Sequence, residues 1–151
     1  MLFKHELCLE PYLLAVEDRD KRVLLTKFRI GICPLRIETG RYEQVSKNVR
    51  GLPEAERTCK CCVTCVHASD MVENEFHFLL ICPAYDCERT KLFDTVRDVF
   101  KMSADDVNRS RYDINNLFTR LMESDDDIII NATASFLDRA FYKRELLLLQ
   151  A

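Results

Sequence analysis

Four cysteines lie within the seven-residue stretch CKCCVTC, residues 59–65. Cysteines this close together can form disulfides, bind a metal as thiolates, or pack as small buried side chains. A Cys-x-Cys-Cys run cannot pair entirely within itself without strain. The N-terminus lacks the apolar core of a secretory signal peptide, so we expect an intracellular protein, nuclear or cytoplasmic, with reduced thiols. We therefore interpret the cluster as metal-binding, with a reduced, partly buried cluster as the alternative.

Zinc is the metal that this pattern favours, because zinc takes four thiolate or imidazole ligands, commonly as two short pairs. Cys59 and Cys62 form one such pair. His77 and Cys82, with four residues between them, form a second pair. A set of three cysteines and one histidine fills the coordination sphere, which predicts a structural site and not a catalytic one.

The first pair of ligands has an alternative. Cys62 and Cys65 have the same Cys-x-x-Cys spacing as Cys59 and Cys62, and Cys61 breaks either register. His67 and Cys87 could also substitute for one of the four ligands. From the residues alone, the choice among these sets stays open.

Charge is distributed unevenly along a chain of 151 residues whose net charge is -3. Lys and Arg outnumber Asp and Glu by 12 to 9 in residues 1–60, whereas residues 61–151 hold 10 basic and 16 acidic residues. Such an asymmetry hints at a charged partner on one side. No run of about 18 apolar residues occurs, so we expect no membrane span.

Apolar spacing predicts a mainly α protein, a helical domain with a small irregular Cys-Cys-His-Cys zinc element in its middle. Gly, Pro and Thr-Gly signals predict a loop with a short extended piece over residues 31–45. We divide the chain into a helix plus zinc-binding module, residues 1–92, and a helical region packed on it, residues 93–151. The expected helices run over residues 11–31, from Pro83 onward, from Asp113 and from near Asp127 to the C-terminus.

Three stretches together resemble a known family: LLTKFRIGICPLRIETGRY (24–42), RTCKCC (57–62) and VENEFHFLLICPAYDCER (72–89). They are similar to the zinc-binding segment that follows the reverse transcriptase domain in LINE-type (non-LTR) retrotransposons of animals. The resemblance covers residues 20–92. It implies Cys59, Cys62, His77 and Cys82 as ligands, although the extra cysteines keep Cys65 as a substitute. It also implies a role in holding template RNA or target DNA.

Nucleic acid, RNA or DNA, is thus the partner that we expect. Lysine and arginine neutralise phosphates and release counterions, and an aromatic ring can stack on an unpaired base. Each candidate alone could equally be an ordinary surface charge. The candidates are Lys27, Arg29, Arg36, Arg41, Lys47, Arg50, Arg57 and Lys60, with Tyr42 as the stacking ring.

Enzyme chemistry is not expected from this sequence. The chain has no Tyr-x-Asp-Asp motif, no Gly-rich phosphate loop and no Ser/His/Asp arrangement, and it is too short for a polymerase palm. We expect no small-molecule substrate and no membrane partner. The alternative function is a protein-interaction or self-association scaffold with a structural zinc, because the C-terminal ELLLLQA is unusually apolar.

Overall fold

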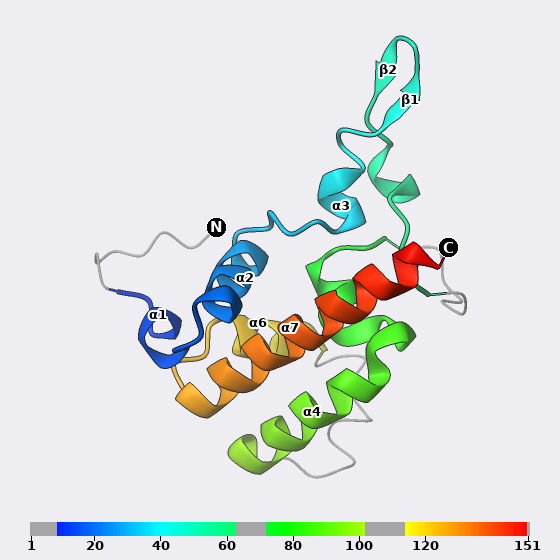
Figure 1. Cartoon of the computed structure of the whole chain (residues 1–151). Coiled ribbons are helices and arrows are strands. Elements are labelled where there is room, and N and C mark those ends of the chain that lie inside the picture. Colours follow the sequence, from blue (N-terminus) through cyan, green and yellow to red (C-terminus); the bar gives the residue numbers. More distant parts are fainter. Residues whose placement is uncertain (1–8, 63–71, 102–113, 151) are drawn as a thin grey trace.

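The computed structural model describes residues 9–62, 72–101 and 114–150, and it is mainly helical, as predicted. The long helix α7 (Asp127–Leu149) contacts four other helices: α1 (Tyr12–Ala15), α2 (Arg19–Arg29), α4 (Asp86–Phe100) and α6 (Ile114–Met122). A short helix, α3 (Arg36–Thr39), leads from these packed helices into a two-stranded hairpin that extends away from them (Figure 1).

Helix α7 begins where the sequence predicts it. The Asp126 carboxylate accepts hydrogen bonds from the backbone N–H groups of Ile128 and Ile129, at 2.9 and 3.1 Å, which is an N-terminal cap. One face of the helix is buried along most of its length, from Ile129 to Arg144. This buried face places α7 against both α2 and α4 and makes it the common support of the fold.

The single helix predicted over residues 11–31 is wrong, because the chain breaks between α1 and α2. Val16 takes an extended conformation and is buried, and Asp18 then caps α2 by accepting from the N–H groups of Asp20 and Lys21. Arg22 donates to the Val16 carbonyl at 2.8 Å and so closes the corner. Burying Val16 and capping α2 both require the break, and an apolar periodicity alone does not reveal it.

An aromatic cluster forms the centre of the core. The ring of Phe78 lies 4.5 Å from Phe141, 4.6 Å from Tyr85, 6.0 Å from Phe28 and 6.2 Å from Phe136, measured between centroids. These rings come from α2, α7 and the segment between the cysteine stretch and α4. Because Phe78 directly follows His77, this packing fixes the position of that histidine.

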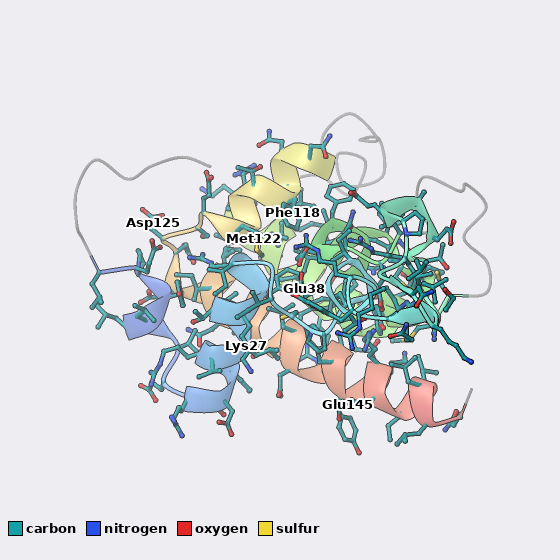
Figure 2. The ribbon with its side chains drawn as sticks, turned by 90° about the horizontal axis from the view of Figure 1, so that it is seen from above. Lys27, Glu38, Phe118, Met122, Asp125 and Glu145 are labelled. Atoms are coloured by element: carbon teal, nitrogen blue, oxygen red, sulfur yellow. The ribbon has the colours of Figure 1, made fainter. Side chains whose placement is uncertain are left out.

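Helix α6 covers one side of the core. Its Phe118 ring lies 5.7 Å from that of Phe76, and Phe118 and Met122 both pack on the buried cluster. Figure 2 shows both side chains on α6, with Lys27 on α2 below them. Asp113, predicted to begin this helix, lies outside the described residues.

The hairpin consists of β1 (Gln44–Ser46) and β2 (Val49–Arg50), paired antiparallel, and all of their residues are exposed. Gly51 closes it with a φ of +85°, where a side chain would be strained and an added Cβ would lie 2.8 Å from the Arg41 carbonyl oxygen. Arg57, which follows a 3₁₀ turn at Glu54–Glu56, donates to the carbonyls of Ile37 at 3.0 Å and Leu52 at 2.9 Å. The root of the hairpin is therefore tied to α3.

Helix α4 crosses residues 92 and 93, where we divide the chain into two regions, and that division stays a prediction. Among the described residues, no helix is long and apolar enough to span a membrane.

Candidate metal centre

The structure brings together the four residues of the predicted ligand set. One ligand atom from each of Cys59, Cys62, His77 and Cys82 lies within 4.8 Å of the others, and all four residues are buried. The sulfurs of Cys59 and Cys82 are 3.8 Å apart, and the Cys62 sulfur is 3.6 Å from His77 Nε2. Such a buried cluster of three thiols and one imidazole could bind a metal ion.

A π-helical turn, His77–Ile81, positions the second pair of ligands. The Asn74 side chain accepts from the His77 backbone N–H at 2.8 Å, and the Cys82 N–H donates to the His77 carbonyl, also at 2.8 Å. In this wider turn the donor lies five positions after the acceptor, which brings His77 and Cys82 to the same side.

Arg89 holds the end of this turn from α4. It is buried, and its guanidinium donates to the carbonyls of Leu79 at 2.8 Å and Cys82 at 2.7 Å. These carbonyls lie at the end of the turn and do not accept the regular hydrogen bonds of an α-helix. The arginine supplies donors for them and thereby fixes the Cys82 backbone.

The first pair of ligands approaches through a short antiparallel contact. Thr58 pairs with Val72 in an isolated β-bridge, and the Glu73 N–H donates to the Arg57 carbonyl at 2.9 Å. This contact joins the segment before Cys59 to the segment before the π-helical turn. It brings the two ligand pairs together although 14 residues separate Cys62 from His77.

Glu73 connects the cluster to α7 and was not predicted from the sequence. Its side chain is fully buried, and Arg144 on α7 binds both of its oxygens, Nε to Oε1 and Nη2 to Oε2, each at 2.8 Å. The Arg36 backbone N–H donates to Oε2 at 2.8 Å, and the Cys59 thiol donates to Oε1 at 3.7 Å. Burial lowers the pKa of Arg144, but its hydrogen bonds to Glu73 outweigh this effect and raise it above the usual value.

Cys59, Cys61 and Glu73 form a second, overlapping group of possible donors. The Glu73 carboxylate is already engaged by Arg144 and the Arg36 N–H. A hydrogen bond with Cys59, together with burial, raises the pKa of the Cys61 thiol strongly, which opposes the thiolate that a metal requires. The four-residue set is therefore the better metal site, and Cys61 is a neighbour of it.

A metal binds cysteine as the thiolate, so the thiols of the cluster must lose their protons when a metal binds. A hydrogen bond from Cys61 lowers the pKa of Cys59, but the adjacent Cys82 thiol and burial raise it more, to about 11. A cation must displace these protons to bind, so the affinity of the site for a metal falls as the pH falls.

The remaining candidate ligands lie elsewhere. Cys65 and His67 are outside the described residues. Cys87 is exposed on α4 and belongs to neither group of donors. Cys33 is buried apart from the cluster, where burial, followed by the charge of Glu75, raises the pKa of its thiol to about 12.

The structure divides the nine candidate nucleic-acid contacts into two groups. Arg29, Arg36 and Arg57 are partly buried and engaged: Arg29 lies over the Tyr12 ring at 4.4 Å, and Arg36 pairs with Glu43. Lys27 is exposed on α2, apart from the hairpin (Figure 2). The other exposed candidates lie on the hairpin or on the cysteine stretch and are Arg41, Tyr42, Lys47, Arg50 and Lys60.

Comparisons of the chain with models of protein families, with curated proteins and with solved structures give no match.

Proposed function

We propose that this chain is a zinc-stabilised module that binds RNA or DNA, and that it belongs to or derives from a LINE-type retrotransposon protein, as its sequence resemblance implies. The observation that carries the proposal is a basic, exposed hairpin rooted beside a buried cluster of three cysteines and one histidine. The metal stabilises the root, and the hairpin presents the binding groups.

Zinc is the metal that fits the spacing of the donors. In a tetrahedron with Zn–S bonds of about 2.3 Å and Zn–N bonds of about 2.0 Å, two sulfurs lie about 3.8 Å apart and a sulfur lies about 3.5 Å from the nitrogen. The corresponding distances here are 3.8 Å for Cys59 and Cys82 and 3.6 Å for Cys62 and His77. Four protein ligands leave no open position, so zinc would serve structure and not catalysis.

The hairpin supports the choice of nucleic acid. Lys47 and Arg50 are exposed on it, and Arg41 just before it is exposed although it also pairs with Glu38 at 3.3 Å. Tyr42 is 72% exposed and available for stacking on an unpaired base. Its acidic residue, Glu43, is already paired with Arg36. Positive charge on an exposed two-stranded projection, next to an exposed ring, suits a single strand or an open loop.

Two measurements test this function. Elemental analysis of the purified chain should give one zinc per molecule. Anisotropy with a labelled single-stranded oligonucleotide, over about 50–200 mM salt, should then show affinity that falls steeply as salt rises. A chain without zinc, or binding that ignores salt, would contradict the proposal.

A matched pair of variants locates the interface. Each variant replaces three exposed cations by glutamine, so both change the net charge by the same amount. Because the hairpin variant can no longer neutralise three phosphates, it should reduce the salt slope by about 2, whereas the control should leave the slope unchanged. An equal loss of affinity in both variants would mean that the hairpin is not the interface. The hairpin variant changes Arg41, Lys47 and Arg50, and the control changes Arg19, Lys91 and Lys101.

The alternative scaffold function has one observation in its favour. The C-terminal turns of α7 expose Tyr142, Leu146 and Leu149, the last of them 84% exposed. Self-association through this end predicts a concentration-dependent dimer for the intact chain and a monomer for a chain that ends before Leu146. Monomers in both cases would exclude self-association through this end of α7.

A further inference from the structure

An open hollow of about 600 Å³ is lined by residues of α3, the cysteine stretch and the C-terminal end of α7. Its volume is within the range of sites that bind small ligands. Its lining is basic, and none of the lining residues in the described part of the chain is acidic. The lining residues are Pro34, Arg36, Thr39, Lys60, Arg144 and Leu148.

Of the three cations that line this hollow, Lys60 is the one that forms no ion pair with a carboxylate of the described residues. Arg144 is bound by Glu73 through two hydrogen bonds of 2.8 Å, and Arg36 is paired with Glu43. Lys60 is exposed and has no carboxylate within ion-pair distance among the described residues. The positive charge of Lys60 helps to hold the pKa of Glu43 below its usual value, after the hydrogen bond from Arg36, so these charges act on one another.

One ion pair links the hollow to the start of the hairpin. Glu43 directly follows Tyr42 and precedes β1, and its ion pair with Arg36 connects the start of the hairpin to the lining of the hollow. Lys60 lies between Cys59, which is buried in the candidate metal site, and Cys61. A strand that stacks on Tyr42 would therefore extend toward Lys60.

We propose that this hollow binds one phosphate group of the nucleic-acid strand, with the Lys60 ammonium as its main contact and the Arg36 guanidinium beside it. This inference rests on the proposed function and adds to it a specific subsite. A phosphate supplies the negative charge that Lys60 lacks among the described residues, and a hollow concentrates the field of its cations more than a flat surface does. The Thr39 hydroxyl donates its proton to the Leu35 carbonyl at 3.1 Å. Thr39 therefore forms part of the wall of the hollow and does not donate to the phosphate.

The test compares three variants with the wild-type chain in the oligonucleotide assay. Lys60→Gln removes the charge, and Lys60→Arg keeps it. Leu148→Glu adds an opposing charge from α7, far from the cysteines in sequence, so it tests the hollow without touching the ligand loop. Lys91→Gln, at an exposed position on α4 that does not line the hollow, is the control. Zinc content and circular dichroism show that each variant is folded.

The expected result is a several-fold weaker affinity for Lys60→Gln and Leu148→Glu, with a salt slope lower by about 0.7 for Lys60→Gln, the value for one phosphate on a single strand. Lys60→Arg and Lys91→Gln should bind like the wild type. If the wild type binds but Lys60→Gln and Lys91→Gln behave alike, the phosphate subsite is wrong while the proposed function stands. If the wild type binds no oligonucleotide, the proposed function itself is wrong.

A second measurement separates a strand phosphate from free phosphate. Wild-type chain is titrated with inorganic phosphate and followed by amide chemical shifts. Weak shifts at Thr39 and Lys60 that a bound oligonucleotide suppresses support the strand as the source. Saturable shifts that the oligonucleotide leaves unchanged would overturn it.

Discussion

Removing Arg144 should destabilise the protein more than the loss of any surface charge. Arg144→Met keeps most of the aliphatic volume of the side chain and removes the guanidinium. Glu73, whose side chain is 0% exposed against 9% for that of Arg144, then stays buried without its cation. Among the described residues, only the Arg36 N–H and the Cys59 thiol then remain as its donors.

The size of the effect follows from this burial. Breaking a buried ion pair by removing one partner costs about 3–5 kcal/mol, because the other charge is left uncompensated. For a chain of this size, 1 kcal/mol shifts the melting temperature by about 2–4 °C, so the expected loss is about 6–20 °C. Natural domains have about 5–15 kcal/mol in total, so the variant loses a large share of its stability.

Urea unfolding of the two single variants and the double variant completes the test. Glu73→Gln leaves Arg144 without its anion and should cost a similar amount. The double variant Glu73→Gln/Arg144→Met removes both charges, so it should lose clearly less than the sum of the two single losses. Lys143→Ala is the control: its ion pair with Glu88 at 3.1 Å stays partly exposed, at 34% and 18% of the two side chains, so solvent screening keeps its contribution at about 1 kcal/mol or below.

A loss of about 1 kcal/mol or less for Arg144→Met, or single losses that add in the double variant, would refute this reasoning. The Glu73–Arg144 ion pair would then contribute little to the free energy of unfolding, and the two charges would not depend on one another. Equal losses for Arg144→Met and Lys143→Ala would lead to the same conclusion.

Three further predictions concern other sites. Cys82→Ser should abolish stoichiometric zinc and unfold its surroundings, since metal-binding energy is folding energy there, whereas elemental analysis of Cys87→Ser should show full zinc. Asp126→Ala should cost about 1 kcal/mol in urea unfolding by removing the cap of α7, and Asp125→Ala, which makes no cap, close to nothing. Burial raises the pKa of Glu75 above its usual 4.5, so its contribution to stability is present below pH 4.5 and lost as the pH rises through the raised value. Glu75→Gln should thus unfold at a higher urea concentration than wild type near neutral pH, and an unchanged midpoint there would contradict the prediction.

Local patterns were enough to predict part of this structure. The Cys-x-x-Cys pair and the His-x4-Cys pair are each set by one turn of backbone, so spacing predicts two ligand pairs, although it left Cys62 and Cys65 as an alternative first pair. The start of α7 was predictable for the same reason, because the aspartates before Ile128 provide an N-terminal cap within three residues. The first helix was misjudged because the buried extended conformation of Val16 depends on packing between distant elements.

The exposed hairpin and the Glu73–Arg144 pair were beyond local patterns. Glu73 and Arg144 are 71 residues apart, and nothing near either residue marks it as buried. Glu73 lies in the VENEF run on which the family resemblance depends, but acidic residues are rarely buried, so its type does not indicate a buried position. Similarly, Arg29, Arg36 and Arg57 resembled the exposed arginines in sequence, and only the fold shows which side chains are engaged.

Glu73 explains how the segment around the cysteine–histidine cluster can hold the root of the hairpin in place. Its backbone carbonyl accepts from Ile37 N–H at 2.9 Å and its carboxylate from Arg36 N–H at 2.8 Å, both on the segment that leads to the hairpin. The same carboxylate binds Arg144 on α7 and lies against Cys59. One buried residue thus joins the ligand loop, the hairpin root and the long helix. Because zinc would hold the loop and Arg144 would hold Glu73, the loss of either one should loosen the hairpin before it unfolds the helices.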